Sequence, residues 1–177
     1  GLIDHVIKFA KDREYKIEYK SFPKVVNKYD KGDFERFARN LNLSIEPRDY
    51  QIDAFLYAIN HERCLLLSPT ASGKSFIIYL LIRYYQQKVS NFKCLVIVPT
   101  TSLVAQMSSD FNEYAKDDSW NSAENIHQIF QGRDKVSDRP IYISTWQSLY
   151  KLPANYYADF DMILGDEAHQ FKAKSLS

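Results

Sequence analysis

The sequence predicts an α/β fold with a parallel central sheet, preceded by a small α+β segment. From residue 47 onward, short apolar runs of strand length alternate with longer amphipathic segments of helical length. Small, turn-forming or acidic residues directly follow four of the apolar runs, at Ser68, Pro99, Thr145 and Asp166. Right-handed crossovers make successive strands parallel, so these four positions are expected at one edge of the sheet, where such folds bind ligands.

Composition restricts the classes of function. The chain has 177 residues, of which 45% are hydrophobic and 25% charged, as in a globular protein with one domain or a domain plus an appendage. The formal net charge of +1 excludes a global basic field, so any nucleic-acid contact has to come from local patches. No apolar run approaches the roughly 18 residues that span a bilayer, so no membrane partner is expected. Cys64 and Cys94 both fall in predicted buried strands and suit reduced thiols in the cytoplasm.

Residues 1–45 are expected to form an N-terminal appendage, and residues 46–177 the main domain. Apolar spacing predicts a helix over 2–10, alternation predicts a short strand over 15–19, and a clear amphipathic helix opens near Asp33. The lysines of this segment are read either as a solvated face or as a DNA-binding patch. Because the chain begins with Gly1 and its last motif lies close to its end, it is expected to be a fragment of something longer.

The main domain opens with a helix that begins near Pro47 and carries an apolar stripe to Ile59. Further helices are predicted over 76–87 and 103–114. Strands are predicted over 64–67, 93–98, 125–130, 141–145 and 162–164.

The loop between the first strand and its helix has the residues that phosphate binding requires. Gly73 lets the backbone approach an anion closely, and the N–H groups of the loop and of the helix start then point at it. Lys74 adds a positive charge for the terminal phosphates, and Ser75 offers a hydroxyl to Mg²⁺. Ser68 stands where the usual pattern has its first glycine, so on these residues alone an ordinary loop stays open.

A second motif follows the strand at 162–164, where Asp166 and Glu167 are adjacent. A carboxylate at a strand end can hold Mg²⁺, often through water, because this cation prefers oxygen ligands. Its neighbour can orient or deprotonate the water that attacks a terminal phosphate. The alternative, a solvated acidic turn, is disfavoured by the phosphate loop upstream.

These stretches resemble motifs I and II of superfamily 2 helicases, with a DEAH-type motif II. Other stretches resemble the family's glutamine motif, motif Ia and motif Ib/Ic. The quoted segments are Ser68–Ser75, Asp166–His169, Pro47–Ala54, Val98–Gln106 and Ser144–Leu149. The resemblance implies a RecA-like P-loop NTPase domain, here truncated before motif III, that uses ATP and Mg²⁺.

The resemblance also implies roles for individual residues. Lys74, Asp166 and Glu167 would be catalytic, and Ser75 with Asp166 would hold the metal. Gln51 would read adenine with both ends of its amide, which gives specificity because a donor and an acceptor are both required. The remaining nucleotide contacts would come from Arg48, Thr70, Ala71, Ser72, Gly73 and His169, the last of which links the site to a partner lobe.

Nucleic acid would contact Thr100, Thr101, Thr145 and Gln147 in the family's arrangement. A threonine at a helix start is ordinarily a cap, but the same geometry leaves N–H groups for a phosphate.

By resemblance the whole protein would be an ATP-dependent DNA helicase that unwinds or branch-migrates recombination and replication intermediates. Its partners would be DNA, bound without sequence preference, and a second RecA-like lobe of the same parent chain. The charge-stabilising arginines would come from that lobe, so this chain alone would be nearly inactive. The alternatives are a restriction-type DNA translocase, an RNA helicase, or an ATP-binding docking switch without strand separation.

Overall fold

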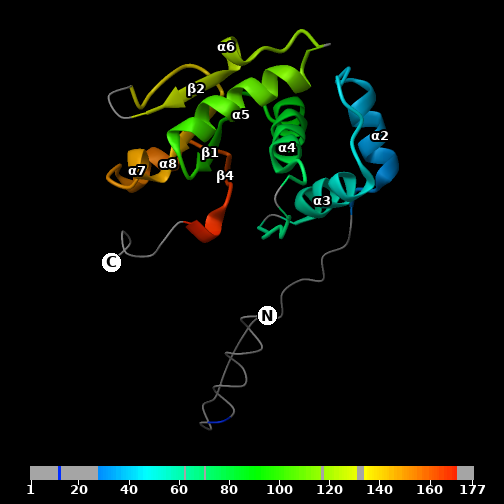
Figure 1. The fold of residues 1–177 in the computed structure, drawn as a ribbon, viewed down its shortest axis with the longest axis horizontal. Coiled ribbons are helices and arrows are strands. Elements are labelled where there is room, and N and C mark those ends of the chain that lie inside the picture. The colour runs from blue at the N-terminus through cyan, green and yellow to red at the C-terminus, as the bar shows by residue number, and fades with distance from the viewer. Residues whose placement is uncertain are drawn as a thin grey trace.

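The computed structural model describes residue 12 and residues 28–61, 63–69, 71–116, 118–130 and 134–170. Helices and a parallel sheet make up this part of the chain, which confirms the predicted α/β fold (Figure 1). The helix predicted over 2–10 and the strand predicted over 15–19 lie outside the described residues. None of the helices within those ranges is long and apolar enough to cross a membrane.

The sheet has four strands in the order β2-β3-β1-β4, and all neighbouring pairs are parallel. These strands are β1 (Cys94–Val98), β2 (Ile126–Ile129), β3 (Ile141–Thr145) and β4 (Met162–Gly165). They confirm the strands predicted over 93–98, 125–130, 141–145 and 162–164. In the register, Cys94 lies opposite Ile141 on one side and Met162 on the other. The carboxyl ends of the strands therefore lie at one edge, as the sequence predicted for Pro99, Thr145 and Asp166.

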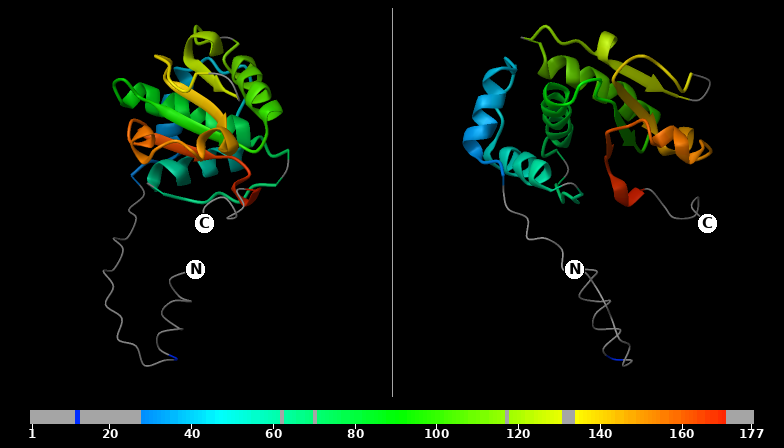
Figure 2. Two further views of the ribbon diagram at one scale, coloured as in Figure 1. Left: turned by 90° about the vertical axis from the view of Figure 1, so that its left-hand side faces the viewer. Right: turned by 180° about the vertical axis from the view of Figure 1, so that it is seen from behind.

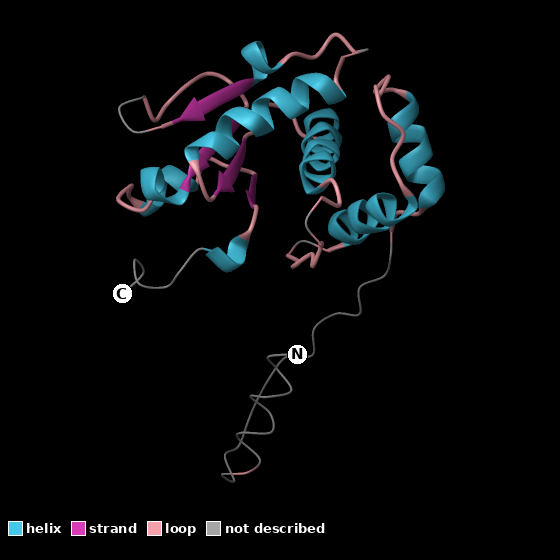
Figure 3. Cartoon of the chain, viewed as in Figure 1, coloured by secondary structure: helices cyan, strands magenta, loops and turns pink. Residues whose placement is uncertain are grey.

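Helices cover both faces of this sheet (Figures 2 and 3). Alternate strand residues pack into two separate clusters, one with α4 and α5 and one with the α7–α8 segment. The helical elements are α2 (Lys31–Arg39), α3 (Asp49–Asn60), α4 (Lys74–Lys88), α5 (Thr101–Tyr114), α6 (Ser122–Asn125), α7 (Trp146–Leu149), α8 (Ala154–Tyr157) and the 3-10 helix η1 (Ala168–Gln170). The helices predicted near Asp33, from near Pro47 to Ile59, over 76–87 and over 103–114 are confirmed by α2, α3, α4 and α5. The third of these begins two residues before Phe76, and Pro47 lies just ahead of α3.

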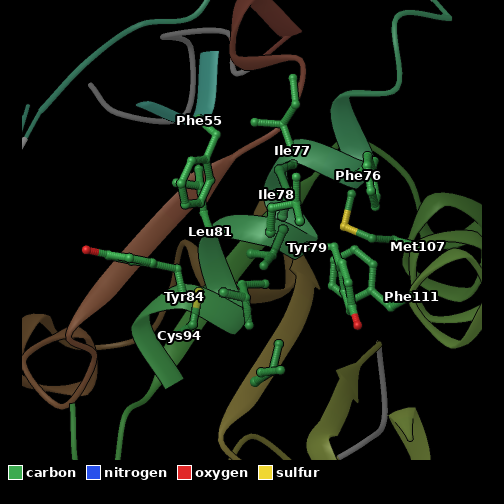
Figure 4. Close-up of a cluster of buried hydrophobic side chains, with 14 of the residues drawn as sticks. Phe55, Phe76, Ile77, Ile78, Tyr79, Leu81, Tyr84, Cys94, Met107 and Phe111 are labelled. Atoms are coloured by element: carbon green, nitrogen blue, oxygen red, sulfur yellow. The ribbon is translucent and has the colours of Figure 1, made fainter. Parts of the chain in front are cut away.

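Helix α4 is the centre of the main core, and its residues from Phe76 to Tyr84 are buried all round. Figure 4 shows Phe76 and Tyr79 on the side of Met107 and Phe111, with Phe55 close to the other side of the helix. A helix that is apolar on every side has to be enclosed by other elements. The sheet and α5 enclose one side of α4, and α2 with α3 enclose the other (Figure 1).

Helix α2 shares this core. Phe37 stacks on Phe55 with ring centroids 5.4 Å apart and meets Tyr84 edge-on at 5.4 Å. The first helix of the described region thus packs directly on two helices of the main domain. The domain boundary between residues 45 and 46 stays a prediction.

The strand predicted over Cys64–Leu67 is wrong. This segment is extended but belongs to no strand, and the side chains of Leu65 and Leu67 are 74% and 91% exposed. The thiol of Cys64 is exposed as well, so only Cys94 is a buried cysteine as predicted. No described strand lies beside residues 64–67, so their backbone groups have no strand partner, and the outer side of the edge strand β4 does not pair with them. An apolar run forms a strand only where a neighbour satisfies its backbone groups.

Candidate nucleotide site and nucleic-acid edge

The phosphate loop of the sequence prediction enters α4 through Gly73, whose φ is 77°. A Cβ atom built there would lie 2.4 Å from Nε2 of Gln51, so a larger residue would have to displace this amide and would be strained by the left-handed backbone. Just before it, Ser72 is buried and its hydroxyl is hydrogen-bonded to that of Ser68. Ala71 is exposed and has a left-handed φ of 62°. Thr70, also predicted to contact the nucleotide, lies outside the described residues.

Gln51 ties α3 to this loop. Its Nε2 donates to the carbonyl of Ser72 at 3.0 Å, and its Oε1 accepts from the backbone N–H of Arg48 at 2.9 Å. Tyr50 adds a second tie, since its hydroxyl donates to the same carbonyl at 2.9 Å. An amide side chain has two donor hydrogens and two acceptor lone pairs, so Gln51 keeps one of each beyond these bonds. Gln51 is thus held beside the loop with hydrogen-bonding capacity to spare. Its role in reading adenine stays a prediction.

Lys74 and Glu167 come together although they lie 93 residues apart in sequence. The ammonium of Lys74 donates to Oε1 of Glu167, and both side chains are about three-quarters buried. The two predicted motifs are thus parts of one site. Glu167 has a left-handed φ of 51°. This conformation is unfavourable for any residue other than glycine, and it tends to occur at functional sites.

Asp166 lies beside this ion pair at the end of β4. Its backbone N–H donates to the carbonyl of Ile97 at 2.9 Å, which fixes the strand end against β1. Burial raises the pKa of the Asp166 carboxyl; the charge of Lys74 lowers it and the charge of Glu167 raises it again. A cation close to this carboxyl would favour its ionised form.

Ser75 contacts a residue that the sequence did not assign to the site. Its Oγ lies 2.8 Å from the hydroxyl of Tyr114, which ends α5. Burial raises the pKa of Asp110 and of Tyr114, while the hydrogen bond with Ser75 lowers each of them. Tyr114 is the last residue of the helix predicted over 103–114, and its spacing of four residues from Asp110 was the available signal that both face one way.

The residues present fit a nucleotide and its magnesium ion. The loop offers backbone without a side chain at Gly73, a lysine follows it, and a serine hydroxyl and an aspartate supply oxygen ligands. No group of three or more His, Cys, Asp or Glu in the described part of the chain could hold a metal by itself. A magnesium ion here would therefore depend on phosphate and water oxygens in addition to Ser75 and Asp166.

The predicted nucleic-acid residues lie at the same edge of the sheet. Val98 of β1 pairs with Thr145 of β3, so the starts of α5 and α7 are neighbours. Thr100 and Thr101 are exposed; Oγ1 of Thr100 accepts from the N–H of Leu103 at 3.4 Å and caps α5. Thr145 is buried with Oγ1 3.2 Å from the hydroxyl of Ser148, whereas Gln147 is exposed. A phosphate contact at Thr145 would thus come from the backbone, and all four residues stay predictions.

The backbone of His169 lies in η1, directly after the two carboxylates. The second motif therefore continues from the strand end into this short helix. The link of His169 to a partner lobe stays a prediction. The rings of His61 and His127 bond to backbone carbonyls, those of Tyr57 at 2.7 Å and of Asp134 at 2.9 Å.

Comparison with known proteins places this geometry in context. Residues 44–177 match the sequence profile of the family described as type III restriction enzyme, res subunit. The chain is 34% identical to the ATP-dependent DNA helicase uvsW of Enterobacteria phage T4; the match covers 100% of this chain and 36% of that protein. It is 25% identical to the DNA 3'-5' translocase XPB2 of Sulfurisphaera tokodaii, over 75% of this chain and 27% of that protein.

Among solved structures, the chain is similar to the crystal structure of the UvsW helicase from bacteriophage T4. That match has a TM-score of 0.80 and 32% sequence identity, and it covers 99% of this chain and 64% of the other.

Proposed function

We propose that this chain, which belongs to the family described as type III restriction enzyme, res subunit, binds ATP with Mg²⁺. It would do so as the first RecA-like domain of a DNA helicase. The chain spans 36% of the length of its phage relative. The parent protein would couple ATP hydrolysis to the unwinding or branch migration of recombination and replication intermediates. Its second RecA-like lobe would complete the site, and it would work in the cytoplasm, that of the host if the source is a phage.

The observation that carries this proposal is the contact between Lys74 and Glu167. A lysine at a helix start, next to a glycine with φ of 77°, is suited to bind an anion, because the N–H groups of the helix start and the lysine charge both attract it. A carboxylate already within reach of that lysine lies where a water attacking the terminal phosphate has to be held. An ordinary loop and a solvated acidic turn, the alternatives for each motif alone, give no reason for the two to meet.

The chain's own residues would act as follows. Lys74 would exchange Glu167 for the oxygens of the terminal phosphates, which releases the carboxylate to orient the attacking water. Asp166 and Ser75 would hold the metal, and Gln51 would place the base through its remaining donor and acceptor. When bound, magnesium supplies the positive charge that offsets the negative charge developing on the phosphates.

The test is ADP and ATP binding in the presence of Mg²⁺, measured by titration calorimetry on wild type and on Lys74→Ala. Loss of a charge-assisted contact of about 1.5–3 kcal/mol should weaken binding roughly 10- to 100-fold. Lys88→Ala is the matched control, because this lysine ends the same helix and lies over the ring of Tyr84. Equal affinity of wild type and Lys74→Ala would remove Lys74 from the site and with it the proposal.

The kind of movement on nucleic acid is tested on the parent protein. Strand separation and branch migration assays on forked DNA, run beside a triplex-displacement assay, distinguish a helicase from a duplex translocase. An RNA duplex in the same assays tests the polymer. ATP-dependent displacement of a triplex without strand separation would favour the restriction-type translocase instead.

A further inference from the structure

Tyr50 connects the start of α3 to the phosphate loop. Its hydroxyl donates to the carbonyl of Ser72 at 2.9 Å, and this carbonyl belongs to the peptide unit that leads into Gly73. We propose that Tyr50 is a positioning residue, which keeps this peptide unit turned so that the N–H of Gly73 can bind a phosphate. The inference rests on the proposed function, because it concerns the nucleotide bound at that loop.

The donors and acceptors of this contact follow from the groups themselves. A carbonyl oxygen only accepts hydrogen bonds, and a guanidinium only donates them. Nη1 of Arg48 lies 3.2 Å from the oxygen of Tyr50, so the arginine donates there and the hydrogen of Tyr50 goes to Ser72. Consecutive hydrogen bonds of this kind strengthen one another. The three groups therefore form one directed chain of hydrogen bonds, from the residue before α3 into the loop.

The geometry of the peptide unit turns this contact into an orientation. A trans peptide is planar, and its C=O and N–H groups point in opposite directions. The described part of the chain contains no cis peptide bond, so a C=O of Ser72 that points at α3 makes the N–H of Gly73 point away from it. No hydrogen-bond partner of this N–H occurs within the described residues. It is therefore available to an anion at the start of α4.

The backbone around this peptide unit needs such a restraint. Ala71 has φ of 62° and Gly73 has φ of 77°, so Ser72 lies between two left-handed residues. For alanine this conformation is unfavourable, and it persists only where the surroundings determine it. A loop of this kind can relax by rotating a peptide unit, which would turn a carbonyl oxygen instead of an N–H toward the phosphate. The bond from Tyr50 opposes that rotation.

Tyr50 also divides the work at α3 with its neighbour. Nε2 of Gln51 donates to the same carbonyl of Ser72 at 3.0 Å, and a carbonyl oxygen has two lone pairs, so both bonds form together. The amide of Gln51 is the group that is proposed to place the base as well. Tyr50 has no such second task, so it holds the loop whether or not a base is bound.

This division predicts which ligands depend on Tyr50. Pyrophosphate with Mg²⁺ contacts only the phosphate part of the site, and adenosine only the base part. We expect Tyr50→Phe to weaken the binding of pyrophosphate and of ADP by about 3- to 10-fold, the effect of one lost hydrogen bond. The affinity for adenosine should stay unchanged, because the ring of residue 50 and the side chains of Arg48 and Gln51 remain.

The experiment titrates wild type and Tyr50→Phe with each of the three ligands and follows the backbone signals by NMR, which also measures weak binding. The substitution removes one oxygen atom, and thermal unfolding checks that the variant folds. Tyr57→Phe is the matched control, because this tyrosine lies on the same helix, is 48% exposed against 44% for Tyr50, and stacks on His61. Before any ligand is added, the amide signal of Gly73 should shift in Tyr50→Phe and stay in place in the control.

Three results would overturn the inference. Wild-type affinity of Tyr50→Phe for pyrophosphate would show that the loop needs no restraint from Tyr50. Weaker binding of adenosine with unchanged binding of pyrophosphate would place Tyr50 at the base instead. An equal loss of pyrophosphate affinity in Tyr57→Phe would make the effect a general one of α3. If wild type itself binds neither ADP nor pyrophosphate, the proposed function fails and takes this inference with it; a Tyr50→Phe variant that behaves like a binding wild type leaves the proposed function standing.

Discussion

The absence of a side chain at Gly73 allows the left-handed backbone of the phosphate loop and the close approach of Gln51. With φ at 77° and Nε2 of Gln51 only 2.4 Å from the place of a Cβ, a larger residue here would be strained and would push the Gln51 amide aside. The same amide donates to the carbonyl of Ser72, so glycine, serine and glutamine form one unit. Displacing Gln51 would therefore disturb both the loop and the residue expected to read adenine.

Gly73→Ala should both destabilise the protein and weaken nucleotide binding. Left-handed backbone costs an alanine about 1–2 kcal/mol, and the clash with Gln51 adds to this. We expect the free energy of unfolding in urea to fall by at least that amount and ADP affinity to fall with it. Gly32→Ala is the control, because Gly32 lies in the first turn of α2 and the atom nearest to its added Cβ would be Oδ1 of the N-cap Asp30, at 3.2 Å. Wild-type ADP affinity in Gly73→Ala would contradict this account of the loop.

Much of the site could be predicted residue by residue from its sequence motifs. Gly73, Lys74 and Glu167 were assigned from local chemistry and are found together. Tyr114 was missed because the apolar pattern of a helix does not reveal which of its side chains meets a polar partner on another helix. The hydrogen bond depends on how α4 and α5 pack, which no local pattern records.

Among the elements, α4 shows what apolar content alone predicts well. Nearly every position from Phe76 to Tyr84 is apolar, and the structure buries all of them, including one charged residue, Arg83. The guanidinium of Arg83 donates to Asp118 at 2.6 Å and to the hydroxyl of Tyr79 at 2.6 Å, and it lies 5.5 Å from the ring centre of Trp120. This cation thus links α4 to the segment that follows α5.

Asp118→Asn should destabilise the protein at neutral pH. The side chains of the pair are only 10% and 15% exposed, and removing one charge leaves the other buried without its partner. We expect the free energy of unfolding to fall by about 3 kcal/mol. Asp159→Asn, at an exposed position, should stay within about 0.5 kcal/mol of wild type.

The pH dependence of that difference follows from the pKa of Asp118. Burial pushes this pKa upward, but the hydrogen bond and charge of Arg83 outweigh it, so the pKa is lowered from 3.8. A lowered folded-state pKa gives stability that is present above the unfolded value and lost as the pH falls through the folded one. The gap between wild type and Asp118→Asn should therefore close below pH 3.8 in urea titrations. A gap that persists unchanged at such pH would mean that the charge of Asp118 contributes nothing.

The extended segment at Cys64–Leu67 marks where prediction by element reaches its limit. Its length, apolar content and flanking turns are those of a strand, and the same signals succeeded at β1, β3 and β4. Strand formation also needs a neighbour with free backbone groups. That requirement concerns the order of the strands in the sheet, which apolar patterns do not encode.

On the scale of the whole molecule, the near-neutral charge limits how the proposed DNA partner would be held. With a net charge of +1, binding would have to rest on local donors such as the exposed start of α5 at Thr100 and Thr101. We expect the affinity for duplexes of unrelated sequence to be equal, with a log–log salt slope of about −3, the value for roughly three phosphates. Fluorescence anisotropy across a salt series measures both quantities. A slope steeper than about −6 would indicate a broad basic surface instead.

The position of β4 at the rim of the described sheet affects how the purified chain behaves at high concentration. One side of this strand pairs with β1, and along the strand every second residue is exposed, Ile163 among them. A strand open on one side offers its N–H and C=O groups to any extended chain that comes near, and apolar side chains around it favour adhesion. Leu65 and Leu67 present such apolar surface on an extended segment. Molecules at high concentration therefore have a means to adhere edge to edge while still folded, so precipitation would set in without prior denaturation.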